Sequence, residues 1–178
     1  MKRIFPHSHS RFKPNAGGFG NGIVRYNNKE EFPKELPTTN DQMAVLQSYV
    51  APKQLYRVWF LRGKIQCAVV RHSEGALAAC AASATSSLQA HQLSSVVKEE
   101  IEGKLLPLIP DAHCGSIEYL TDHSQQKDDV RYYFDVNLLS TLPLVETVSN
   151  AAQVWGPNYD PWMELANAIL DFAEKEGT

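Results

Sequence analysis

A lysine followed by four closely spaced glycines is the first group of residues in this 178-residue sequence whose types suggest chemistry. The stretch runs from Lys13 to Gly22, and its other glycines are Gly17, Gly18 and Gly20. Glycine loses more backbone freedom on folding than any other residue, so this cluster indicates positive φ angles or a close approach of backbone to a ligand. Backbone amides of such loops commonly surround phosphate, and a lysine ammonium just before the loop can reach phosphates as a point charge.

The residues after the glycines indicate what kind of phosphate loop this is. Residues 22–26 are β-branched and aromatic enough to form a strand, whereas dinucleotide-binding loops and Walker loops lead into a helix. We therefore interpret the glycines as a hairpin flap over phosphates, of the kind that covers ATP in protein kinases. A flexible hairpin turn without a ligand is the alternative.

Three oxygen-bearing side chains further along the chain form the second group. Asp135 and Asn137 are two residues apart on an expected strand, so they share a face, and Glu118 lies on a neighbouring expected strand. If the two strands pair, three oxygen ligands converge, which suits Mg²⁺ because this ion keeps water and phosphate oxygens in its other positions. The alternative is that Asp135 and Asn137 only end a strand and begin a turn.

Composition limits the class of protein. The net charge of −3 gives no support to nucleic acid or a membrane surface as partner, and no apolar run approaches the ~20 residues that span a bilayer. Three widely spaced cysteines, Cys67, Cys80 and Cys114, form no C-x-x-C pair, so we expect reduced thiols, with Cys114 buried in a strand. The scattered histidines show no spacing typical of a metal site or a catalytic base. We expect a cytoplasmic protein.

Strands are the main elements that must position these groups. We predict strands at residues 10–13, 22–26, 44–50, 114–120 and 131–136, and a β-hairpin of residues 56–61 and 64–71 around Arg62 and Gly63. Helices are predicted at 28–36, at 93–106 and at about 160–175. The last begins with Asp160 and Pro161, and its expected apolar face is Trp162, Leu165, Ala166, Ile169 and Phe172. Residues 73–90, rich in Ala and Ser, are interpreted as a loop, although they would also tolerate a helix.

These motifs, in this order, resemble the ATP-grasp superfamily of ATP-dependent carboxylate–amine ligases. The matching parts are the Lys-Pro-Asn-x-Gly-Gly-x-Gly-x-Gly stretch, residues 46–50, the hairpin, residues 116–120 and residues 134–137 with Pro143. The resemblance covers roughly residues 11 to 143, which is only the C-terminal ATP-binding portion of such a ligase. It implies an α+β fold of two small lobes, mainly antiparallel sheet with packed helices, that enclose a nucleotide cleft.

The resemblance also implies roles for individual residues. Lys13 would contact the α and β phosphates beneath Gly17, Gly18, Phe19 and Gly20. Gln47, Ser48, Tyr49 and Val50 would form a hinge, near residues 47–52, whose backbone binds adenine. Glu118, Asp135 and Asn137 would hold Mg²⁺, and Arg57 and Arg71 would neutralise phosphate or the substrate carboxylate.

The two arginines raise a geometric problem. With a two-residue turn at Arg62 and Gly63, Arg57 lies opposite Ala68 and Arg71 lies opposite Gln54, so the arginines face opposite sides of the hairpin. A bulge or a twisted end is needed for both to reach one site.

Several departures from the family pattern leave three functions open. The family's substrate-side domain has no counterpart here, Ser48 stands where the hinge usually has an acid, and Tyr56 replaces the acid that often precedes the hairpin arginine. The first function is that of an ATP-grasp enzyme acting on an unidentified carboxylate. The second is that of a degenerate module that binds nucleotide or a partner without catalysis. The third is that of a structural domain that binds no nucleotide. A second copy or a partner chain would supply the missing lobe. We divide the chain into a tail (1–10), the ATP-grasp-like region (11–143) and a C-terminal extension (144–178).

Overall fold

The computed structural model describes residues 10–14, 24–26, 30–31, 44–48, 52–72, 88–122, 130–138 and 140–176. The chain forms two compact units, one of Met1–Pro52 with Ser73–Ala84 and the other of Lys53–His72 with Thr85–Thr178. Within the described ranges no helix has the length and apolar character needed to cross a membrane.

The first unit contains a three-stranded antiparallel sheet. Its order is β2 (Val24–Tyr26), β1 (Ser10–Pro14) and β3 (Ala44–Ser48), with Phe12 paired to Val24 on one side and to Leu46 on the other. The three predicted strands are therefore present, and β3 is described up to Ser48. Of the predicted helix at 28–36 only Glu30 and Glu31 are described, as a turn. The glycine loop lies outside the described residues.

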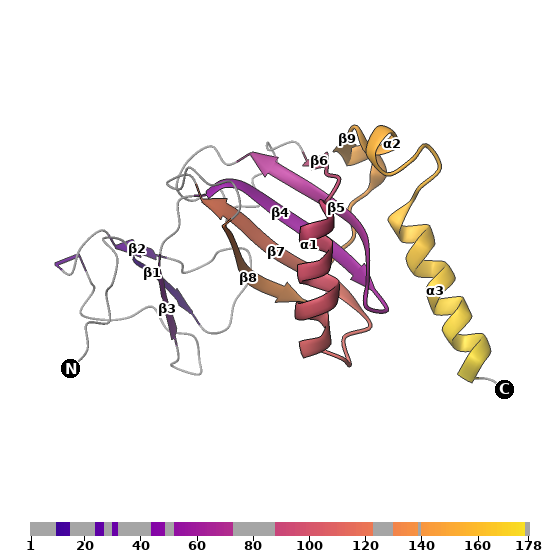
Figure 1. Ribbon diagram of the computed structural model, residues 1–178, viewed down its shortest axis with the longest axis horizontal. Helices are drawn as coiled ribbons and strands as arrows, with labels where there is room; N and C mark the ends of the chain where they lie inside the picture. The colour runs from indigo at the N-terminus through magenta and orange to yellow at the C-terminus, as the bar shows by residue number, and fades with distance from the viewer. Residues whose placement is uncertain are drawn as a thin grey trace. The chain divides into compact units, whose positions relative to one another are not determined.

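A six-stranded sheet dominates the second unit (Figure 1). Its order is β8-β7-β4-β5-β6-β9, with antiparallel pairing of β7 with β8, of β4 with β5 and of β5 with β6, and parallel pairing of β6 with β9. The strands are β4 (Pro52–Leu61), β5 (Lys64–His72), β6 (Leu88–Ala90), β7 (Cys114–Asp122), β8 (Arg131–Asn137) and β9 (Val148–Ser149).

The β4–β5 hairpin closes as the sequence predicts. Leu61 pairs with Lys64, and the two residues between them, Arg62 and Gly63, have φ angles of 51° and 72°. Two successive positive φ angles define the tight turn whose twist suits antiparallel strands, and glycine at the second position adopts such an angle without a Cβ penalty.

One face of this sheet is covered by the predicted amphipathic helix (Figure 1). The helix begins as α1 (Ser95–Glu100), where the Ser94 hydroxyl accepts from the amide of Val97, and continues through a π-turn, η1 (Ile101–Leu105), into a 3₁₀ turn, η2 (Leu106–Leu108). Its buried side chains pack on alternate strand residues, and the cluster comprises Tyr56, Val58, Phe60, Ala68, Val70, Leu93, Val97, Ile101, Leu106, Ile117 and Tyr119.

The other face carries a smaller core around Trp59, Cys67 and Val69, and the C-terminal segment closes it. That segment contains η3 (Val145–Thr147), β9 and α2 (Ala151–Val154), which the sequence pattern did not predict. Asn150 connects it to the sheet, because its Oδ1 accepts from the amide of Ala90 at 3.0 Å. The prediction of a loop at 73–90 is therefore wrong at its end, where residues 88–90 form β6 by pairing with β5 and β9.

The last helix, α3 (Pro161–Glu176), begins as predicted. The Asp160 carboxylate accepts from the amide of Trp162 at 2.8 Å, and Pro161 occupies the first helical position. The predicted apolar face is not buried, however: Trp162, Ile169 and Phe172 are all exposed.

Candidate functional site

The three predicted metal ligands lie on one face of the sheet, on two paired strands. Glu118 of β7 is directly opposite Asp135 of β8, and Ser116 is directly opposite Asn137. Opposite residues in an antiparallel pair project to the same face, and residues two apart do so as well. The register therefore brings Glu118, Asp135 and Asn137 together.

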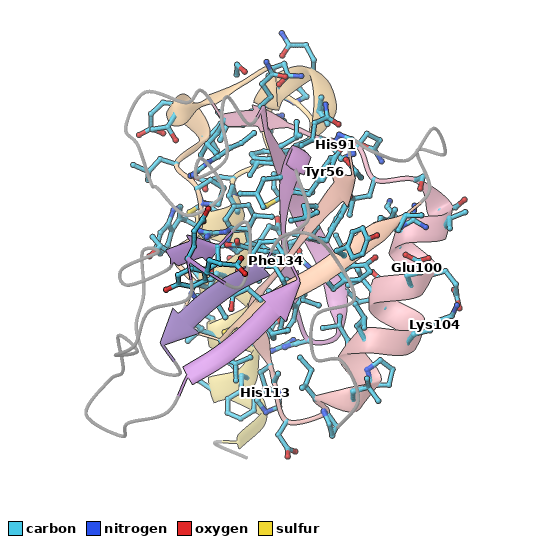
Figure 2. The ribbon with its side chains drawn as sticks, turned by 90° about the vertical axis from the view of Figure 1, so that its left-hand side faces the viewer. Tyr56, His91, Glu100, Lys104, His113 and Phe134 are labelled. Atoms are coloured by element: carbon cyan, nitrogen blue, oxygen red, sulfur yellow. The ribbon has the colours of Figure 1, made fainter. Side chains whose placement is uncertain are left out.

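A bulge in β8 makes this arrangement possible. Glu118 pairs with Asp135 but Tyr119 pairs with Tyr133, so Phe134 is an extra residue in β8 (Figure 2). An extra residue reverses which face the following side chains point to. As a result Tyr133 packs with the core under α1, whereas Asp135 projects from the opposite face with Glu118.

A second bulge resolves the problem of the two arginines. Phe60 pairs with Ile65 but Trp59 pairs with Cys67, so Gln66 is an extra residue in β5. Arg57 then lies opposite Val69, and Arg71 lies opposite Leu55. Because Leu55 and Arg57 are two residues apart on β4, both arginines project from one face. The pairing expected from the turn alone, Arg57 with Ala68 and Arg71 with Gln54, is wrong by one residue.

Arg57 contacts Glu118, one of the three predicted metal ligands. Its Nε donates to Oε1 of Glu118 at 2.5 Å, and its Nη2 also contacts that oxygen. The Glu118 side chain is 7% exposed and the Arg57 side chain is 37% exposed, so a buried carboxylate is paired with a guanidinium that reaches solvent. The guanidinium carbon of Arg57 also lies over the Trp59 ring, 5.9 Å from its centre, and forms a cation–π contact with it.

The electrostatics show how closely these charges are coupled. Burial raises the pKa of Glu118, and the negative charge of Asp135 raises it further, while Arg57 and Arg71 oppose the shift. Burial also lowers the pKa of Arg71, with the neighbouring charge of Arg57 as the second cause. The charges of two carboxylates and two guanidiniums thus lie close enough to interact with one another.

Ser116 also lies on this face, although it was not among the predicted site residues. It is fully buried, its hydroxyl oxygen has no hydrogen-bond partner, and it lies opposite Asn137. A buried polar atom without a partner costs free energy, so it marks a place where water or a ligand group belongs. The sequence signal was its spacing of two from Glu118, which puts both side chains on one face.

The predicted residues of the first unit are only partly described. Lys13 lies in β1 opposite Val45, and Gln47 and Ser48 lie in β3 opposite Arg11 and Ser10. Gly17, Gly18, Phe19, Gly20, Tyr49 and Val50 lie outside the described residues. Their roles remain predictions.

No other cluster in the described part of the chain competes for metal chemistry. Within that part there is no group of three or more His, Cys, Asp and Glu side chains placed to hold a metal ion. Glu118 and Asp135 are two carboxylates, and the third donor, Asn137, is an amide. Cys114 lies in a strand as predicted, but it is exposed rather than buried.

Comparison with known proteins gives structural matches but none by sequence. No family model matches the chain, and no curated protein does. Among solved structures, the ATP-grasp ligase PsnB complexed with a minimal precursor variant, Mg and ADP has a TM-score of 0.60 at 12% identity, over 92% of this chain and 46% of that chain. The D-alanine–D-alanine ligase of Bacillus anthracis complexed with ATP has a TM-score of 0.55 at 16% identity, over 96% and 57%. The D-cycloserine synthetase DcsG has a TM-score of 0.56 at 14% identity, over 84% and 54%.

These matches define the class of fold. The chain has an α+β, ATP-grasp-like fold, as the sequence resemblance predicted, and it spans about half the length of the ligases it matches. At such low identity the likeness concerns the fold, and function has to be argued from the site.

Proposed function

We propose that this chain binds Mg-ATP and takes part in an ATP-dependent ligation through an acyl phosphate. The observation that carries the proposal is the register that places Glu118, Asp135 and Asn137 on one face with Arg57 and Arg71. The ATP-grasp-like fold is the second support. Together they match the need of phosphoryl transfer for positioning and for neutralisation of charge.

The oxygen donors fit Mg²⁺. Two carboxylates and one amide are hard ligands, and Mg²⁺ takes few of these from the protein because water and phosphate oxygens complete its octahedron. The partnerless hydroxyl of Ser116, buried on the same face, is consistent with a polar occupant nearby. When bound, the ion would neutralise phosphate charge. Glu118, Asp135 and Asn137 would hold it.

Arg57 and Arg71 would serve the reacting groups. In the proposed reaction an oxygen of the substrate carboxylate attacks the γ-phosphorus of ATP and ADP leaves; an amine or similar nucleophile then attacks the acyl carbon and phosphate leaves. Negative charge accumulates at the transferred phosphoryl group, which two guanidiniums on one face can stabilise. Arg57 would exchange its contact with Glu118 for the ligand once a cation neutralises that carboxylate.

The family resemblance implies nucleotide-binding roles for residues of the first unit as well. We propose that Lys13 contacts the α and β phosphates, that the loop at Gly17, Gly18, Phe19 and Gly20 covers them, and that the backbone of residues 47–50 binds adenine. These roles come from the family resemblance and from the residue types, a lysine and a glycine loop.

Calorimetry with Mg²⁺ and a non-hydrolysable ATP analogue tests the proposal. The double variant Asp135→Ala/Asn137→Ala should lose binding by at least about tenfold, because two of three ligands are gone. The matched control Asp111→Ala/Asn167→Ala removes the same two groups from exposed positions in the η2–β7 turn and in α3, and should bind like the wild type. For the wild type, ligand at ~100 times its dissociation constant should stabilise the fold by ~2.7 kcal/mol. Equal binding by the wild type and the site variant would refute the proposal.

A degenerate module that binds nucleotide or a partner without catalysis is the second candidate. It is favoured by the residue types at two positions, because Ser48 and Tyr56 stand where the ATP-grasp family usually has acids. ADP release by the purified chain that depends on an added carboxylate would rule this candidate out, and nucleotide binding without such release would support it.

A further inference from the structure

The helix α3 contacts the rest of its unit along one side only. Nη2 of Arg62 donates to the carbonyl of Ala168 at 2.6 Å, Nη1 of Arg62 lies 3.5 Å from Oδ2 of Asp171, and the rings of His113 and Phe172 are 6.5 Å apart. Pro161 is buried and Ala168 is half-buried. These contacts all belong to the side of the helix that faces the β4–β5 turn, and α3 extends along that part of the unit to the C-terminus (Figure 1).

The opposite side of α3 is apolar and exposed. Trp162 is 40% exposed, Met163 57%, Ile169 59% and Leu170 61%, and Ala166 and Ala173 are also exposed. At about 100° per residue, Trp162, Ala166, Ile169 and Ala173 form one stripe along the helix, flanked on one side by Met163 and Leu170. Glu164 and Asp171 lie on the far side of the helix from this stripe, so no charge interrupts it between its first and last residues.

The sizes of the side chains in this stripe allow it to pack against the same stripe of a second copy. Along the helix it reads large, small, large, small, from Trp162 through Ala166 and Ile169 to Ala173. When two such helices lie antiparallel about a two-fold axis between residues 167 and 168, Trp162 faces Ala173 of the other copy and Ala166 faces Ile169 of the other copy. Each large side chain then meets a small one, which is the packing that a symmetric interface requires.

We propose that α3 is a dimer contact, through which two copies of this chain pair with their α3 helices antiparallel. The exposed area is sufficient for a weak dimer. The stripe and its flanks offer roughly 500 Å² per copy, hence about 1,000 Å² for the pair, which is near the lower limit for a specific interface. Interfaces near that lower limit are typical of weak association, although affinity depends on packing quality as well as on area.

Sedimentation velocity on the purified chain tests the proposal. The monomer mass is 19.9 kDa, so the species should shift toward twice that value as the concentration rises. The variant Ile169→Asp places two charges beside the two-fold axis and should raise the dissociation constant at least about tenfold. The control Val96→Asp changes an apolar residue of α1 that is 58% exposed, close to the exposure of Ile169, and should leave the dimer unchanged.

A charge exchange tests the antiparallel geometry itself. Ala166→Lys and Ile169→Glu should each be monomeric alone, and their mixture should form a heterodimer, since the proposed pairing brings these two positions together. Far-UV circular dichroism of each variant checks that the fold is intact. A wild type that stays monomeric up to about 200 µM overturns the proposal, because a specific dimer, even a weak one, should be populated at that concentration. A dimer that Ile169→Asp leaves intact, or a charged mixture that stays monomeric, overturns it equally.

Discussion

Removal of the Arg57 side chain should destabilise the fold, and the cost should depend on pH. Arg57→Ala leaves the carboxylate of Glu118, 7% exposed, without its bonded cation. Breaking a fully buried ion pair costs ~3–5 kcal/mol, but the Arg57 side chain is 37% exposed and solvent screens the pair, so we expect about 2 kcal/mol at neutral pH.

The pH dependence follows from the pKa of Glu118. Burial already raises this pKa above the ordinary value of 4.5, and Arg57 is one of the charges that oppose the shift, so its loss raises the pKa further. An acid whose pKa is higher in the folded state holds its proton longer there, and folded stability therefore falls as pH rises from about 4.5 through the raised pKa. The penalty of Arg57→Ala should accordingly be fully present above that pKa and shrink toward zero as Glu118 becomes protonated.

Urea unfolding of Arg57→Ala at about pH 8, about pH 6 and about pH 4.5 measures this dependence. Lys64→Ala is the matched control, because Lys64 pairs with Glu102 at 3.2 Å but is 72% exposed, and its loss should cost less than about 1 kcal/mol. Adding Glu118→Gln to Arg57→Ala should recover part of the lost stability by removing the uncompensated charge. A cost equal to that of the control, or one that does not change with pH, would refute this account of the pair.

Three further changes test the sheet around the site. Glu100 accepts two hydrogen bonds from Arg131, and these bonds are the main cause of its lowered pKa of about 2. Glu100→Gln should therefore lower the free energy of unfolding by about 1–2 kcal/mol at pH 7. Urea unfolding should show this cost vanish as pH falls from about 4.5 toward 2, because Glu100 then becomes protonated in the wild type as well. Gly115→Ala would place a Cβ 2.7 Å from the backbone oxygen of Asn137, so Asn137 would have to shift. Calorimetry should then show weakened Mg-ATP binding, although Gly115 itself is not a proposed ligand. Unchanged binding would contradict the proposed role of Asn137. Gly63→Ala, at φ 72° in open space, should lower the free energy of unfolding by about 1 kcal/mol without affecting nucleotide binding.

Local sequence determined the elements of this protein. Arg62 and Gly63 specify a tight hairpin turn, Asp160 and Pro161 start α3, and the aromatic and β-branched residues of 114–120 and 131–136 form β7 and β8. The turn and the helix start depend on residues close in the chain, and the two strands depend on residue types that favour extended backbone, which is why the pattern was sufficient. The order of individually loose motifs was also enough to indicate the ATP-grasp-like fold.

Tertiary structure decided which faces those elements present. The extra residues Gln66 and Phe134 exist only relative to the partner strand, and they determine whether Arg71 and Asp135 project toward the candidate site. Strand β6 forms because distant segments pair with it, so its composition alone suggested a loop. The apolar side chains of α3 predicted burial, but whether a helix face is covered depends on what lies beside it. Sequence thus named the candidate residues, and pairing across strands brought them onto one face.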